Sequence, residues 1–283
     1  MGADPANAGA TSAPCITLYD IAFASPCDKN TCAPNPWKAR YALNFKGVTY
    51  STEWVQMADI AKVRRGLGVP ACRKFADGTD YYTLPVLKDP STGSCIGDSF
   101  DIAHYLQTTY PDAGAGDLFP PQQLDYVCPG SILIPLTERS DNVHPEYVRF
   151  NDNVDMAFTL HVQLMMHGMR WDPACEAAIQ AEFARRAGVG SWDDLSVSGE
   201  ARDKLRASLR DTLRDLAAMY QRDTTGPFLL GSRPSYADII VGGWLSMMSR
   251  TLPEHEWEEI QTWYDGVFGK LHAALQERFG DVK

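Results

Sequence analysis

The sequence predicts an α/β first half followed by an all-α second half. Up to about residue 110, short runs with the two-residue alternation of β-strands lie between segments whose apolar residues recur at helical spacing. After about residue 122 the apolar residues follow helical spacing alone. A stretch over 111–121, rich in glycine, proline and aspartate, separates the two. We therefore expect domains over 15–110 and 122–283, joined by this linker.

Composition excludes several classes of partner. The chain has 283 residues, 45% of them apolar, which is enough for two modest domains. A net charge of -10 argues against nucleic acid or an anionic membrane as a partner. No run approaches the ~18 uncharged apolar residues of a membrane span. Residues 1–14 lack the basic start and apolar core of a signal peptide, so we expect a disordered tail and a cytoplasmic protein.

Cysteine and histidine spacing indicates neither a disulfide framework nor a metal site. The seven cysteines are an odd number and include no Cys-x-x-Cys pair. His161 and His167 are six residues apart and would lie on different faces of a helix. We therefore expect reduced cysteines and no bound metal.

The chain opens with a strand, a helix and a second strand. Residues 16–21 alternate as a strand, and a polar loop over 24–35 follows. Pro36 suits the first position of a helix whose apolar face ends at Gly47. Residues 48–55 then alternate strictly, as in a strand with one buried side.

The second part of the α/β half contains a helix candidate, two strands and a final helix. A basic helix is predicted over 59–67 and a polar loop over 73–80. A strand over 82–87, a turn over 89–93 and a short strand then lead into a helix that begins near Asp98. The resulting order, β-α-β-(α)-β-β-α, is the thioredoxin-like arrangement.

Two features of this unit suit a peptide-like ligand. Pro85 has no N–H and cannot donate a hydrogen bond to a neighbouring strand, which suggests a cis peptide bond with Leu84. The N–H and C=O of Leu84 could then pair with another chain. Ser99 begins a helix whose unpaired amides suit a carboxylate. The alternative remains that Pro85 only starts an edge strand and that Asp98 or Ser99 is only a helix cap.

The second half reads as a series of helices, over 145–167, 174–187, 200–220, 235–249 and 254–279. Ser235 and Asp238 stand at the two positions of a capping box, before a helix without any charge as far as Ser249. The arginines of 200–220 alternate with aspartates, which favours a solvated face over a polyanion site.

A methionine-rich run occupies the first of these helices. It contains Met156, Met165, Met166 and Met169 and ends near Trp171. Such side chains could line an adaptable apolar pocket, and helix packing explains the same stripe, so both interpretations stay open.

The chain resembles the soluble glutathione transferases. The motifs are Thr83-Leu84-Pro85-Val86, Asp98-Ser99, and Ser235-Tyr236-Ala237-Asp238 after Gly231. The segments 16–20, 36–47 and 98–103 are similar, more narrowly, to fungal-specific class A transferases and bacterial lignin β-etherases. The resemblance covers about residues 15–120 well and the helical half more loosely. It implies glutathione as cosubstrate, an aromatic or apolar second ligand, and a homodimer.

Site residues follow from the resemblance. The backbone of Leu84, next to Pro85, would hold the cysteinyl part of glutathione, while Asp98 and Ser99 would hold its γ-glutamyl end. A carboxylate suits the ammonium group, and a hydroxyl with a helix N-terminal amide suits the carboxylate. Asn35 and Lys38 would lie beside the thiol.

The sequence departs from the family at the catalytic position. Alignment on Pro34 and Trp37 places Ala33 where these transferases have serine. The alanine side chain cannot donate a hydrogen bond to a thiolate. A helix N-terminus and the Asn35 amide could supply part of the stabilisation. Ser25, Thr31 and Cys32 could replace the serine, or could simply be loop residues.

Three functions therefore stay open from the sequence. The first is a glutathione transferase with weakened conjugation. The second is a non-catalytic carrier, or ligandin, for aromatic compounds. The third is thiol exchange through Cys32, which would form mixed disulfides with glutathione.

Overall fold

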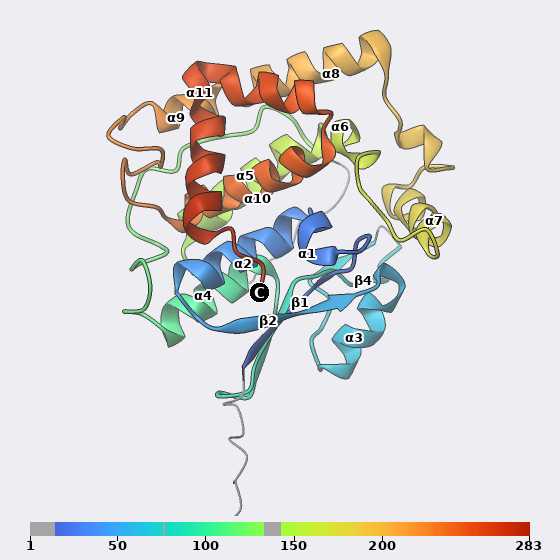
Figure 1. Cartoon of the computed structure of the whole chain (residues 1–283), viewed down its shortest axis with the longest axis horizontal. Coiled ribbons are helices and arrows are strands. Elements are labelled where there is room, and N and C mark those ends of the chain that lie inside the picture. The colour runs from blue at the N-terminus through green and yellow to red at the C-terminus, as the bar shows by residue number, and fades with distance from the viewer. Residues whose placement is uncertain (1–14, 76, 133–142) are drawn as a thin grey trace, which may run out of the picture.

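The computed structural model describes residues 15–75, 77–132 and 143–283 (Figure 1). A mixed sheet with flanking helices forms the first half, and a stack of helices lies above it in this view. The predicted disordered tail over 1–14 lies outside the described residues. The α/β thioredoxin-like half and the all-α half predicted from the sequence are confirmed.

The sheet of the first half has four strands. They are β1 (Ile16–Ile21), β2 (Tyr50–Val55), β5 (Val86–Asp89) and β6 (Ser94–Gly97), in the order β2-β1-β5-β6. Strands β1 and β2 are parallel, and the other pairs are antiparallel. Side chains alternate along β1, so that Leu18 and Tyr19 pack into two different apolar clusters on opposite faces.

Helices cover both faces of this sheet. On the face of Leu18 lie α2 (Pro34–Phe45) and α4 (Ser99–Thr109), while α3 (Ile60–Gly66), preceded by the 3-10 turn η1 (Met57–Asp59), packs on the other (Figure 1). Helix α2 begins at Pro34, two residues before the expected start at Pro36. Both prolines fit a first helical turn, since the N–H that proline lacks has no partner there.

Two predicted loops contain short elements. Helix α1 (Cys27–Asn30) lies within 24–35, and the two-residue strands β3 (Arg73–Lys74) and β4 (Asp80–Tyr81) pair within the region predicted as a polar loop. Phe75 and Tyr81 stack at 4.4 Å across this small hairpin. Elements of two to four residues are too short to show a period in the sequence, so the loop prediction was wrong there.

The second half is helical throughout its regular elements. The predicted helices over 145–167 and 200–220 are each divided in two, and the last helix is kinked at 263–266. The elements are α5 (Pro145–Thr159), α6 (Gln163–Met166), α7 (Glu176–Ala187), η2 (Asp193–Leu195), α8 (Gly199–Thr212), α9 (Arg214–Tyr220), α10 (Tyr236–Thr251) and α11 (Glu254–Phe279).

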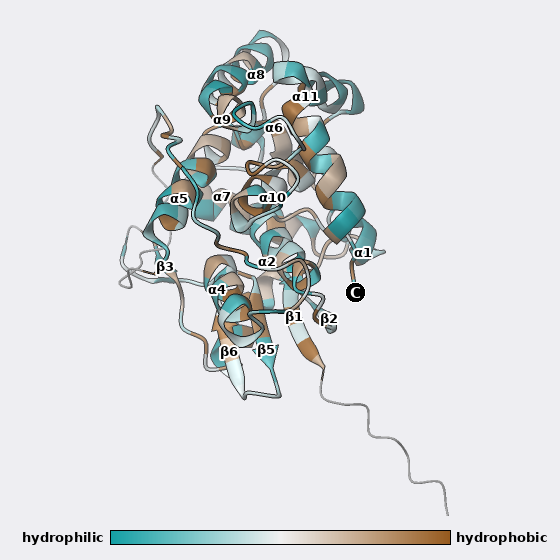
Figure 2. Cartoon of the chain, turned by 90° about the vertical axis from the view of Figure 1, so that its left-hand side faces the viewer, coloured by the Kyte–Doolittle hydropathy of each residue, from teal (hydrophilic) through white to brown (hydrophobic). Residues whose placement is uncertain are grey.

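Two arginines of α8 bind the neighbouring helix instead of facing solvent. Arg202 Nε donates to Glu256 Oε1 of α11 at 2.6 Å, and Arg206 lies 3.2 Å from both Glu256 and Glu259. Glu256 is buried by this contact. The expectation of a solvated face is therefore wrong for these two residues, because α11 packs against them, although the outer side of α8 is strongly hydrophilic (Figure 2).

Helix α10 is the core of the second half. Its residues 236–248 are all buried, and it packs directly on α2, where Tyr41 Oη and Ser246 Oγ lie 2.6 Å apart. Gly243 permits the close approach: a Cβ at this position would lie 2.6 Å from the carbonyl oxygen of Pro34. The contact fixes the N-terminal turn of α2 against the helical half.

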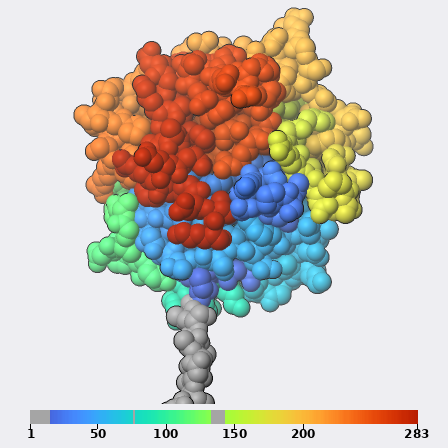
Figure 3. Space-filling model, viewed as in Figure 1, coloured from blue at the N-terminus to red at the C-terminus, as the bar shows by residue number. Residues whose placement is uncertain are grey.

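The C-terminal segment lies across the first half (Figure 3). Asn44 Nδ2 donates to the carbonyl oxygens of Phe279 and Asp281, at 2.7 and 2.8 Å. Thr52 Oγ1 of the edge strand β2 donates to the Lys283 carbonyl oxygen at 2.6 Å. These bonds attach the end of the chain to the sheet and reinforce the contact between the halves.

The predicted capping box is present. Asp238 Oδ2 accepts the Ser235 N–H at 2.8 Å and its hydroxyl at 2.9 Å, and Oδ1 accepts the Leu229 N–H at 2.9 Å. All of these groups are buried. Asp238 therefore satisfies donors on two segments as well as the start of α10.

Replacing Asp238 with alanine should destabilise the fold strongly. Two buried amides would lose their acceptor, so we expect Asp238→Ala to lower the free energy of unfolding by about 3 kcal/mol. Urea denaturation followed by circular dichroism measures this. The control Glu258→Ala changes an exposed acid of α11 and should change stability by less than about 0.5 kcal/mol. Equal effects of both changes would show that the cap does not stabilise α10.

Candidate functional site

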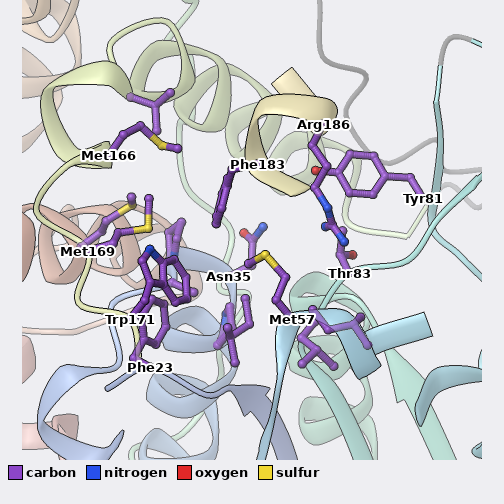
Figure 4. Close-up of a pocket in the computed structure, with 18 of the residues that line it drawn as sticks. Phe23, Asn35, Met57, Tyr81, Thr83, Met166, Met169, Trp171, Phe183 and Arg186 are labelled. Atoms are coloured by element: carbon purple, nitrogen blue, oxygen red, sulfur yellow. The ribbon is translucent and has the colours of Figure 1, made fainter. Parts of the chain in front are cut away.

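A cavity of about 220 Å³ lies between the two halves (Figure 4). Its walls come from both domains, and most of its side chains are apolar. The lining residues are Ile21, Phe23, Ala33, Pro34, Asn35, Pro36, Met57, Ile60, Arg73, Tyr81, Thr83 and Leu84 of the first half, and Val162, Met166, Met169, Trp171, Phe183, Arg186, Trp244 and Met247 of the second.

One side of the cavity is aromatic. The rings of Phe23 and Trp171 stack at 4.5 Å with an interplanar angle of 21°, and Phe183 lies 5.6 Å from Trp171. Figure 4 shows Met166 and Met169 beside this group. Stacked rings and flexible thioethers form an adaptable surface for a flat apolar ligand.

Both interpretations of the methionine-rich run are correct for different residues. Met166, Met169 and Trp171 line the cavity, whereas Met165 and Phe158 are fully buried in the core. Sequence analysis did not identify Phe23, Met57 and Phe183 as residues of the cavity wall. They lie in a loop, a short turn and a separate helix.

The backbone of Leu84 lies at the edge of the cavity. The Leu84-Pro85 peptide bond is cis, as the sequence suggested. Among the described residues, neither the N–H nor the C=O of Leu84 takes part in a hydrogen bond. The preceding carbonyl, that of Thr83, accepts a bond of 2.6 Å from Nη1 of the buried Arg64. The segment is thus held from behind while the Leu84 peptide groups stay available.

Asp98 and Ser99 lie next to this segment at the start of α4. The Asp98 N–H approaches the Pro85 carbonyl oxygen at 3.4 Å, and the Asp98 side chain caps α4 by accepting the Phe100 N–H at 2.9 Å. Asp98 has a φ of 106°, and Ser99 is 4% exposed. The structure therefore brings Leu84, Asp98 and Ser99 together, although the latter two do not line the aromatic cavity itself.

The N-terminal turn of α2 lines the cavity but has few backbone N–H groups available. Pro34 and Pro36 have no N–H, and the Trp37 N–H is bonded to the Ala33 carbonyl oxygen at 3.2 Å. That leaves the N–H of Asn35, which has no partner within the part of the chain that the structure covers. The Asn35 carboxamide lies in the same cavity (Figure 4). A helix N-terminus also carries a partial positive charge, so this turn suits an anion.

The three alternatives to the missing serine do not line the cavity. Cys32 is 1% exposed, and burial raises the pKa of its thiol well above the ordinary range. Thr31 is fully buried and donates to Asp20 Oδ2 at 3.0 Å, and Ser25 is exposed in the preceding loop. Only Ala33 itself reaches the cavity at this point, without a hydroxyl.

Lys38 binds the helical half instead of the cavity. Its ammonium group is fully buried and donates to Asp155 Oδ1 at 2.5 Å and to Asn151 Oδ1 at 2.9 Å. Asp155 Oδ1 also accepts the indole N–H of Trp244, which lines the cavity, at 2.7 Å. This network argues against the expected contact between Lys38 and the thiol and gives Lys38 a role in joining the two halves.

The described residues form neither a metal site nor a membrane span. Within them, no three side chains of histidine, cysteine, aspartate or glutamate are grouped as a metal ion would require. None of the helices described is both long enough and apolar enough to span a bilayer.

Comparison with known proteins identifies the family. Residues 33–109 match the glutathione S-transferase N-terminal domain, and residues 161–278 match the C-terminal domain. A glutathione S-transferase of Ceriporiopsis subvermispora, crystallised in complex with glutathione, is 32% identical, with 95% of this chain and 99% of that chain covered and a TM-score of 0.74. Glutathione transferase GSTFuA2 from Phanerochaete chrysosporium is 25% identical, with 94% and 99% covered and the same TM-score.

A curated relative agrees with the solved structures. The glutathione S-transferase-like protein ustS of Aspergillus flavus is 28% identical over 271 residues, which cover 92% of this chain and 90% of that protein. The similarity thus extends over both halves and not only over the thioredoxin-like part. The chain belongs to the glutathione S-transferase family.

Proposed function

We propose that this protein binds glutathione along Leu84 and transfers it slowly to an apolar or aromatic electrophile. The observation that carries the proposal is a single cavity in which an unpaired peptide edge, a helix N-terminus and an aromatic wall meet. A cysteinyl residue paired with Leu84 would direct its sulfur toward Asn35, with the second ligand between Phe23, Trp171 and Phe183.

The γ-glutamyl end of glutathione would occupy the start of α4. The Asp98 carboxylate would bind the ammonium group, and the Ser99 hydroxyl at the N-terminus of α4 would bind the carboxylate. The short distance between Asp98 N and the Pro85 carbonyl oxygen supports a continuous site, because it places the start of α4 next to the peptide edge.

Thiolate formation depends on Asn35 in this proposal. Lowering the pKa of a thiol from about 8.5 by two units requires about 2.7 kcal/mol of preference for the anion. The Asn35 N–H and carboxamide, together with the α2 dipole, provide part of it. Because Ala33 lacks the hydroxyl that related transferases have, we expect slow conjugation.

A second candidate is a carrier of aromatic compounds with no turnover. Ala33 favours it, because a protein that only binds glutathione and an aromatic ligand needs no thiolate. Rates of conjugation separate the two, since a carrier shows none whether or not it requires glutathione. Thiol exchange through Cys32 is disfavoured by the burial of this residue.

Neutralising Asp98 should weaken glutathione binding. We expect Asp98→Asn to raise the Kd for glutathione about tenfold, because the ammonium group loses its counter-ion. Asparagine keeps an oxygen for the Phe100 amide and tolerates a positive φ, so the fold should be retained. Isothermal titration calorimetry measures the Kd. Asp112→Asn, an exposed change beyond α4, is the matched control and should have no effect. Unchanged affinity of Asp98→Asn would remove Asp98 from the site.

Restoring a hydroxyl at residue 33 should raise conjugation. We expect Ala33→Ser to increase kcat/KM with glutathione and 1-chloro-2,4-dinitrobenzene about tenfold, through one hydrogen bond to the thiolate. Asn35→Ala should lower it by a similar factor. With glutathione saturating, the pH profile of kcat/KM for the electrophile should show a lower pKa of the bound thiol in Ala33→Ser. If neither change alters the rate or the profile, the sulfur does not lie at the α2 N-terminus.

Cys32 should be unreactive in the folded protein. Burial and a raised pKa both suppress the thiolate, so iodoacetamide should label the exposed Cys15 well before Cys32. Mass spectrometry of tryptic peptides measures the order, and denaturation should expose all seven cysteines. Native labelling of Cys32 as fast as that of Cys15 would restore thiol exchange as a candidate.

A further inference from the structure

Helix α7 presents an aromatic ring and a cation to the same cavity. Phe183 and Arg186 are three residues apart, which places them on one face of the helix, and both line the cavity (Figure 4). Figure 4 shows Arg186 beside Tyr81 and Thr83, across from the aromatic wall. Neither residue belongs to a motif that the sequence analysis singled out.

The position of Arg186 is fixed by its neighbours. Its Nε donates to Glu182 Oε1 at 2.7 Å, and its guanidinium lies over the Tyr81 ring at 4.8 Å from the centroid. The side chain is 14% exposed. Its two Nη groups have no hydrogen-bond partner among the residues described, so they can bind a ligand.

The local charge favours an anion. Glu182 is shared between two arginines, since both of its oxygens also accept bonds from Arg185 at 2.8 Å. These arginines lower the pKa of Glu182 to about 2, so it stays ionised and its one charge is divided between them. The Asp77 carboxylate acts on Arg185 as a further counter-charge. No aspartate or glutamate is among the residues that line the described cavity.

We propose that Arg186 binds the anionic substituent of an aromatic second ligand. A ring between Phe183 and Trp171 with a carboxylate, sulfonate or phenolate group would satisfy the apolar wall and the free Nη groups together. The inference rests on the proposed function, because it assigns the aromatic cavity to the second ligand. If Arg186 binds such a group, the charge of an aromatic compound as well as its apolar area determines how tightly the cavity binds it.

Two dyes of similar shape test the inference. We expect Arg186→Gln to raise the Kd for 8-anilinonaphthalene-1-sulfonate about tenfold or more, and to leave the Kd for the uncharged N-phenyl-1-naphthylamine within about twofold. Fluorescence titration measures both. Arg186→Lys keeps the charge without the planar fork and should give an intermediate value for the sulfonate.

Arg185→Gln is the matched control. Arg185 shares Glu182 and lies over Phe75 at 4.5 Å, but it is 56% exposed and does not line the cavity. We expect this variant to bind both dyes as the unchanged protein does. Equal losses in the two variants, or a parallel loss of the uncharged dye in Arg186→Gln, would overturn the inference.

Glutathione affinity separates this inference from the proposed function. Arg186→Gln should leave the Kd for glutathione unchanged. If this variant instead lost glutathione affinity and kept the sulfonate dye, Arg186 would serve the tripeptide and the inference would be wrong. If the unchanged protein bound no glutathione, the proposed function would fail, and the preference for the sulfonate dye would still report on Arg186.

Discussion

The cavity depends on the contact between α2 and the helical half. Gly243 lets α10 approach Pro34. The buried Lys38–Asp155 pair joins α2 to α5, and the Trp244 indole of α10 donates to the same Asp155. Breaking a buried ion pair by removing one partner typically costs about 3–5 kcal/mol. This constraint determines where Asn35 lies relative to the aromatic wall, so the packing of the two halves also sets the geometry of the site.

The parts of the site that the sequence predicted depend on backbone rules. Pro85 and the capping residue Asp98 favour particular local backbone conformations through their own chemistry. The structure has both the cis Leu84-Pro85 bond and the Asp98 cap of α4. The same holds for the Ser235–Asp238 box. Fold class followed from periodicity for a similar reason, because each long element must bury one face.

The remaining parts depend on contacts between distant segments. Lys38 follows the site turn in sequence, yet its ammonium group meets Asp155, 117 residues away. Arg186 reaches the cavity because Glu182 and Tyr81 hold it there, and Cys32 is adjacent to Ala33 but turns into an apolar cluster. Residue type and spacing do not determine the direction in which such side chains point, so these assignments required the structure.

The start of α2 limits the chemistry that this site can perform. Prolines at the first and third helical positions remove two of the amides that a helix N-terminus normally offers, and the N-cap residue Ala33 has no hydroxyl. For the thiolate of the proposed site, the donors left at this turn would be the backbone N–H groups of Ala33 and Asn35 and the Asn35 carboxamide, together with the helix dipole. Because each hydrogen bond to a charged group contributes about 1.5–3 kcal/mol, the lack of one donor would weaken the proposed thiolate stabilisation without abolishing it. In the proposed site, glutathione would bind along Leu84 and the start of α4, so its binding would not depend on this turn.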